Sequence, residues 1–111
     1  MNILSILKIV AALATVATGL LAFVKPDAVY GFTGLTAPGA RGVTEVRAVF
    51  GGLFIALGLA PIWLGQYQIL GIGYLVIAVT RTISIILDKS YAQSNFISLA
   101  IEIVFGAILV A

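Results

Sequence analysis

The sequence contains no cysteine and no histidine. Their absence excludes disulfides, thiolate and imidazole catalysis, and the haem and zinc sites that use those ligands. Four carboxylates remain as metal ligands, and some of them are needed as counter-ions for basic side chains. The chain also lacks an HExxH motif, a phosphate-binding glycine loop and a nucleophile constellation. We therefore expect no catalytic residue, no metal and no cofactor, and the chain is not predicted to be an enzyme.

Charged residues are also scarce. They make up 9% of the 111 residues, whereas a soluble domain carries about 25%. Hydrophobic residues make up 62%, so lipid must be the solvent for most of the surface. The six basic side chains are scattered along the chain, which argues against a nucleic-acid partner. The composition indicates a multi-pass membrane protein whose immediate partner is membrane lipid.

Four apolar segments each approach the roughly 20 residues that a membrane-spanning helix needs. We predict an all-α fold over residues 1–111, a single transmembrane domain built as an antiparallel four-helix bundle with both termini on the same side. The predicted helices cover about residues 3–24, 45–64, 67–88 and 95–111. Residues 25–44 are rich in glycine and are predicted to be a loop, with Thr44 as the N-cap of the second helix. The first segment resembles a signal peptide, but it continues for a full span and is predicted to be retained.

Small residues gather on one face of each of the first two helices. In the first helix Ala12, Thr15 and Gly19 follow helical spacing. This face is predicted to pack against protein, because small residues let membrane helices approach closely. In the second helix small residues recur every four positions, at Ala48, Gly52, Ala56 and Ala60. This small-residue ladder is suited to tight packing, either inside the bundle or against a partner.

Arg81 lies within the third apolar segment, where a charged side chain costs about 2.5–3.5 kcal/mol on insertion scales. A counter-charge at the same depth would offset that cost. Arg81 is seven residues before Asp88, and Glu102 is seven residues after Asn95. At about 1.5 Å per residue, both lie about 10 Å from the same membrane face. We predict that Arg81 and Glu102 form an ion pair.

Further polar side chains are expected at the same end of the bundle. Glu45 and Arg47 begin the second helix and Asp88 ends the third, so all three are predicted to lie near the pair but shallower. Tyr74 and Ser84 share a narrow arc of the third helix with Arg81. The candidate ligand-binding site or buried ion-pair network is therefore Glu45, Arg47, Tyr74, Arg81, Ser84, Asp88 and Glu102.

The distribution of basic residues predicts an orientation. The loops at the charged end contain Lys25, Arg41 and Lys89, whereas the opposite end has Lys8 and the N-terminal amine. The positive-inside rule places the charged end in the cytoplasm and both termini outside.

The residues also resemble a known family. The run TEVRAVFGGLFIALGL at 44–59, the pattern R-x-x-S-x-x-x-D from Arg81 to Asp88 and the lone membrane carboxylate Glu102 are similar to a bacterial family of small four-helix membrane proteins. This family is catalogued as domain of unknown function 4345, with DoxX-like membrane proteins as wider relatives. Phe50 stands where the resemblance leads us to expect a tyrosine, which removes one hydroxyl from the site.

The resemblance covers nearly the whole chain and implies a bacterial inner or plasma membrane location. It implies that the family's charged set is Glu45, Arg47, Arg81, Asp88 and Glu102. It implies no established reaction, although some DoxX-like relatives are linked to quinone-coupled sulphur oxidation.

Three functions fit these observations. The leading interpretation is a non-catalytic accessory or structural membrane protein whose charged cluster sets helix register, because buried ion pairs are often retained for specificity. An alternative is a polar pocket that binds the head of an amphiphile, such as a lipid or a quinone. A second alternative is transport of protons, ions or small molecules, with Glu102 as the titrating group. The small-residue ladder and the chain's small size lead us to expect a homo-oligomer or a place beside a larger membrane complex.

Overall fold

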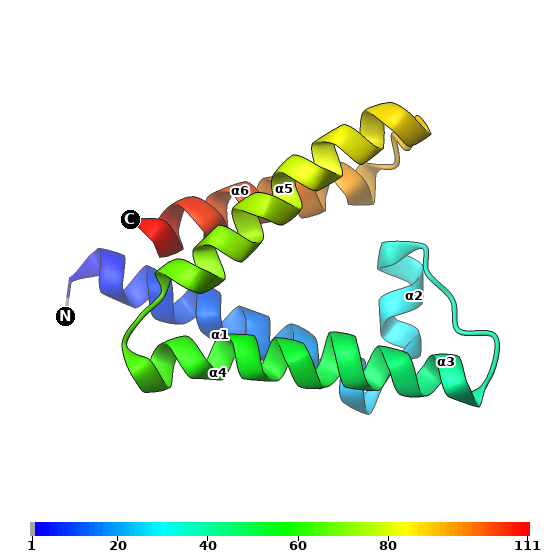
Figure 1. Cartoon of the computed structure of the whole chain (residues 1–111), viewed down its shortest axis with the longest axis horizontal. Helices are drawn as coiled ribbons and strands as arrows, with labels where there is room; N and C mark the ends of the chain where they lie inside the picture. Colours follow the sequence, from blue (N-terminus) through cyan, green and yellow to red (C-terminus); the bar gives the residue numbers. More distant parts are fainter. Residues whose placement is uncertain (1) are drawn as a thin grey trace. The chain divides into compact units, whose positions relative to one another are not determined.

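The computed structural model describes residues 2–111, and all of the regular secondary structure in these residues is helical, without a strand (Figure 1). The helices in chain order are α1 (Ile3–Val24), α2 (Asp27–Thr33), α3 (Ala40–Glu45), the π-helix η1 (Val46–Leu53), α4 (Phe54–Leu64), α5 (Gln68–Asp88) and α6 (Gln93–Val110). The segments α3, η1 and α4 follow one another without a break. The predicted all-α class is therefore confirmed.

Four of the helical segments in residues 2–111 are long and apolar enough to cross a membrane. They are Ile3–Val24, Ala40–Leu64, Gln68–Asp88 and Gln93–Val110. Their lengths and compositions agree with the prediction of a multi-pass membrane protein. Large hydrophobic side chains on all four are exposed, as expected for surfaces that face hydrocarbon.

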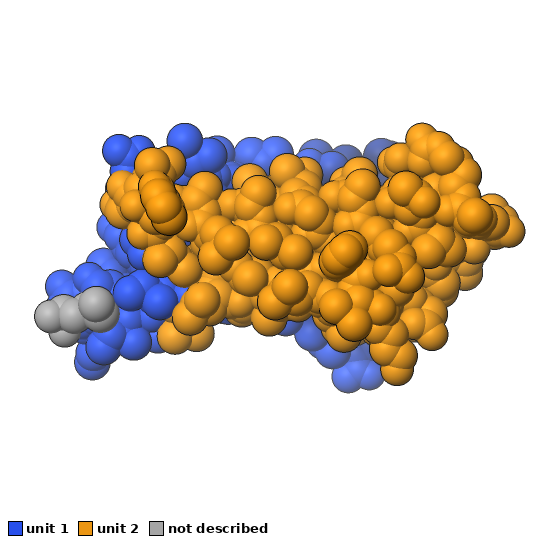
Figure 2. Space-filling view, turned by 90° about the horizontal axis from the view of Figure 1, so that it is seen from below, with its two compact units in different colours: residues 1–9, 66–111 blue, residues 10–65 orange. Residues whose placement is uncertain are grey.

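The chain divides into two compact units, which Figure 2 shows in different colours. One unit comprises residues 1–9 and 66–111, and the other comprises residues 10–65. The first unit is called the α5–α6 unit below, and the second is called the α1–α4 unit.

In the α1–α4 unit, α1 packs antiparallel against the continuous helix formed by α3, η1 and α4. A Cβ on Gly58 would lie 2.5 Å from the carbonyl oxygen of Ala12. A Cβ on Gly19 would lie 2.6 Å from the carbonyl oxygen of Gly51. The two backbones therefore touch at glycine, as membrane helices do when small residues line their contact. The predicted small face of α1 is confirmed, because Ala12, Thr15 and Gly19 are all buried.

The small-residue ladder does not form this contact. Ala48, Gly52, Ala56 and Ala60 are exposed, and a Cβ on Gly52 would meet no atom within 4 Å. Gly51 and Gly58 are the buried glycines of this helix. They occupy a different face of the helix from the ladder, and that face packs on α1.

The prediction of a loop over residues 25–44 is wrong, because helices occupy parts of this range near both of its ends. The short helix α2 occupies Asp27–Thr33 and ends at Gly34, whose φ of 77° is the left-handed conformation that favours glycine. The next helix begins at Ala40 rather than near residue 45. Thr44 is consequently inside the helix, where its hydroxyl donates to the carbonyl oxygen of Ala40 instead of capping an N-terminus.

In the α5–α6 unit, α5 and α6 form an antiparallel hairpin with a short connection. A Cβ on Gly71 would lie 2.8 Å from the Cβ of Leu109, and a Cβ on Gly106 would lie 2.5 Å from a methyl carbon of Leu75. These contacts place the start of α5 beside the end of α6. The connection follows Lys89, whose φ of 51° is left-handed and ends α5. The hairpin register brings the C-terminal half of α5 to the N-terminal half of α6, where the polar residues lie.

Candidate functional site

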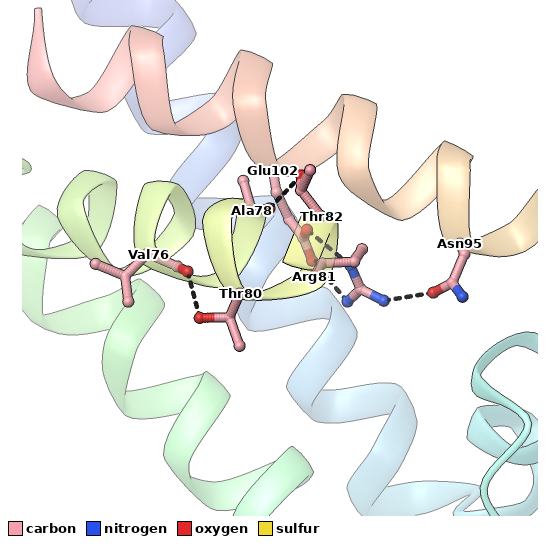
Figure 3. Close-up of polar contacts among 7 residues, drawn as sticks. All are labelled: Val76, Ala78, Thr80, Arg81, Thr82, Asn95 and Glu102. Carbon is pink, nitrogen blue, oxygen red and sulfur yellow. Dashed lines mark hydrogen bonds and ion pairs between the residues drawn. The ribbon is translucent and has the colours of Figure 1, made fainter. Parts of the chain in front are cut away.

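Arg81 of α5 and Glu102 of α6 form the ion pair that is predicted from their equal depth in the membrane. The Arg81 Nε donates to both carboxylate oxygens, at 2.8 Å to Oε1 and 3.1 Å to Oε2, and Nη2 donates to Oε2 at 2.8 Å (Figure 3). Glu102 is 7% exposed, so the carboxylate is almost fully enclosed. A two-point contact of this kind fixes orientation as well as distance, because the planar guanidinium matches the carboxylate.

Asn95 holds the other side of the guanidinium. Arg81 Nη1 donates to Asn95 Oδ1 at 2.9 Å, and Asn95 Nδ2 donates to the carbonyl oxygen and the hydroxyl of Ser90. Asn95 and Glu102 are seven residues apart on α6, about two turns, and therefore lie on the same face. The guanidinium thus bridges two turns of the neighbouring helix, as Figure 3 shows, and Ser90 keeps the Asn95 amide in the orientation that accepts from Arg81.

A groove of about 390 Å³ lies along this face of α5. Its lining residues all belong to the α5–α6 unit: Val76, Ile77, Thr80, Arg81, Ser84, Ile85, Asp88, Ser90 and Asn95. The polar members cluster toward the α5–α6 connection, at the end of the span. Val76 and Ile77 lie about one turn deeper in the span than Arg81 and about three turns deeper than Asp88. The groove therefore has one polar end and one apolar end.

Several polar groups in the groove have unused hydrogen-bonding capacity. A guanidinium has five N–H donors, and Arg81 uses three of them within residues 2–111. Asp88 makes no hydrogen bond or ion pair in the described part of the chain, and neither does the Ser84 hydroxyl. Thr80 differs, because its hydroxyl is bonded to the carbonyl oxygen of Val76. The polar end can therefore donate through Arg81 and accept through Asp88.

The remaining predicted site residues have other partners. Glu45 pairs with Arg41 one turn earlier, and both side chains are exposed. Arg47 donates to the carbonyl oxygen of Phe23 at 3.0 Å, with its guanidinium carbon 6.0 Å from the centre of the Phe23 ring. These contacts lie within the α1–α4 unit. The convergence of Glu45 and Arg47 with the pair at one end of the bundle stays a prediction.

The other predicted residues belong to the α5–α6 unit. Arg81, Ser84 and Asp88 line the groove, and Glu102 is bonded to Arg81. Tyr74 lies deeper along α5, where its ring packs edge-on against Phe105 with the ring centres 5.6 Å apart. Tyr74 does not line the groove.

From the sequence, Asn95 serves only to place the depth of Glu102, and Ser90 is given no role. The structure gives Asn95 a direct bond to Arg81 and makes Ser90 its support. The signal was present, because Asn95 and Glu102 share one face of the predicted fourth helix. No group of three or more potential metal ligands occurs in residues 2–111.

Comparison with known proteins identifies one family. A family model described as "Domain of unknown function (DUF4345)" matches residues 3–111. No curated protein and no solved structure matches the chain. The family match spans both units and includes every candidate site residue.

Proposed function

Because the chain belongs to the DUF4345 family, whose activity is not established, we propose a function from its own side chains. The protein is a non-catalytic membrane protein that binds the polar head of a membrane amphiphile, a lipid or a quinone, in the groove beside Arg81. The observation that carries this proposal is a groove that contains, at one end, a partly used guanidinium and a carboxylate without a partner in residues 2–111.

The two ends of the groove support an amphiphile rather than a wholly polar ligand. The polar end lies where α5 finishes, at the depth where lipid head groups meet water. The apolar end, at Val76 and Ile77, suits the first part of a hydrocarbon chain. A volume of about 390 Å³ is within the range of small-molecule sites, and it suits a head group with the beginning of its tail.

The groove favours binding over a purely structural role for the charged residues. A pair that only sets helix register requires Glu102 to neutralise Arg81, and that contact is already complete. It requires neither the open space nor Asp88 at its edge. Transport of protons has less support, because Glu102 is the buried carboxylate in residues 2–111 and is bonded to Arg81.

Native mass spectrometry of the protein extracted with its lipids tests the proposal. We expect a stoichiometric adduct whose mass identifies a phospholipid or a quinone. The variant Ile77→Trp fills the apolar end of the groove, about one turn before Arg81, and keeps both members of the ion pair. It should remove most of the adduct. Ile83→Trp is the matched control, because Ile83 is an exposed isoleucine of α5 outside the groove.

Two results would contradict the proposal. One is a protein that carries no adduct in any membrane extract. The other is an adduct that survives Ile77→Trp and Ile83→Trp to the same extent, because that ligand would bind somewhere other than the groove.

A further inference from the structure

The charges of the groove are unequally distributed along it. Arg81 and Glu102 neutralise each other as a pair, whereas Asp88 adds a negative charge without a partner in residues 2–111. Lys89 follows Asp88 directly, but it does not line the groove and makes no ion pair with Asp88. The groove therefore offers N–H donors at Arg81 and an anionic acceptor at Asp88.

The spacing of Arg81 and Asp88 along α5 allows both side chains to contact one ligand. Arg81 and Asp88 are seven residues apart, which places them on the same face and about 10 Å apart along the axis. The guanidinium reaches toward Asn95, in the first turn of α6, so its N–H groups lie nearer to the connection than the Arg81 Cα does. The Ser84 hydroxyl lies between them on the same face. A single head group can therefore contact all three side chains.

We propose that the ligand is a zwitterionic phospholipid with a primary ammonium, such as phosphatidylethanolamine, and that Asp88 is the residue that selects it. The phosphate accepts from the two unused Arg81 N–H groups and from Ser84, and the ammonium donates to Asp88. This inference rests on the proposed function, because it names the class of amphiphile that occupies the same groove.

Other head groups complement the groove less well. An anionic glycerol head supplies the same phosphate acceptors for Arg81 but carries no cation to offset the negative charge of Asp88. A choline head carries a positive charge but no N–H donor, so it cannot form the charge-assisted hydrogen bond with Asp88. A quinone carries no cation. A hydrogen bond to a charged group contributes about 1.5–3 kcal/mol, which corresponds to a preference of about tenfold or more.

The test is a titration of the delipidated full chain, followed by native mass spectrometry. The probes are phosphatidylethanolamine, phosphatidylglycerol and phosphatidylcholine with identical oleoyl chains. We expect the ethanolamine lipid to bind about tenfold more tightly than the other two. Asp88→Asn should reduce this preference to about twofold or less, because the amide keeps the shape and loses the charge. Asp27→Asn is the control, since Asp27 is an exposed aspartate of α2 in the other unit and should leave the preference unchanged.

The outcomes separate this inference from the proposed function. Equal binding of the three lipids, sensitive to Ile77→Trp, would overturn the head-group assignment and leave the groove as a lipid site. Tightest binding of the glycerol lipid, or a quinone as the co-purified ligand, would overturn it in the same way. A preference for ethanolamine that persists in Asp88→Asn would show that Asp88 does not select the head. Absence of binding by all three probes and of any co-purified adduct would overturn both proposals.

Discussion

Replacing Glu102 with glutamine is expected to lower the free energy of unfolding by about 3 kcal/mol, because it leaves the Arg81 charge without its counter-charge inside a membrane span. The glutamine side chain still fills the space and still accepts one hydrogen bond, so the loss reflects mainly the missing charge. Unfolding of the purified protein in mixed detergent micelles measures the change. The control is Glu45→Gln, which breaks the exposed pair with Arg41 and should cost less than about 1 kcal/mol.

A double-mutant cycle separates the pair from its surroundings. Arg81→Gln in the Glu102→Gln background removes the unpaired charge, so the double variant should recover part of the stability that Glu102→Gln loses. Asn95 and Glu102 both accept from Arg81, so the recovery is expected to be incomplete. Strictly additive losses would mean that the two side chains do not interact, contrary to the 2.8 Å contact.

Replacing Gly58 with alanine is expected to destabilise the α1–α4 unit by about 3 kcal/mol. The added Cβ would lie 2.5 Å from the Ala12 carbonyl oxygen and 2.8 Å from the Val16 nitrogen. Both are backbone atoms, so the strain can be relieved only if the helices move apart. Alanine has a higher helix propensity than glycine by about 1 kcal/mol, which opposes the effect and is the smaller term.

The same helix provides a matched control. A Cβ on Gly52 meets no atom within 4 Å, so Gly52→Ala should leave stability unchanged or raise it by up to about 1 kcal/mol. Thermal unfolding of both variants in detergent, monitored by the loss of helical circular dichroism, gives the comparison. If Gly52→Ala destabilised the protein as much as Gly58→Ala does, the face that packs on α1 would be the small-residue ladder instead.

The spans and the Arg81–Glu102 pair could be predicted because both follow from two lengths, the thickness of a bilayer and the rise per residue of a helix. Apolar runs of about 20 residues are long enough to span a bilayer, and the short connection between α5 and α6 keeps the ends of these helices level. Depth along each helix then follows from the rise per residue. Two intramembrane charges of opposite sign at equal depth on neighbouring helices have a strong energetic reason to meet.

Other features depend on information that a single sequence does not contain. The sequence of the second helix offers two faces with small residues, one with Gly51 and Gly58 and one with the ladder, and only tertiary packing decides which one meets α1. Residues 25–44 look like a loop because glycine is frequent there, although Gly34 ends α2 and Gly39 precedes α3. The groove itself depends on side-chain directions, such as that of Asn95 toward Arg81, which spacing alone does not specify.

The π-helix η1 also affects how thick a bilayer suits this chain. The continuous segment Ala40–Leu64 has 25 residues, whereas the other three spans have 22, 21 and 18. As a regular α-helix it would be about 37 Å long, against a hydrocarbon core of about 30 Å. A π-helix closes its hydrogen bonds over five residues rather than four, so it advances less per residue and shortens the segment. The longest span thereby approaches the length of its neighbours. Because Arg41, Glu45 and Arg47 lie near its start, the shortening brings these charges closer to the apolar part that the hydrocarbon core must match.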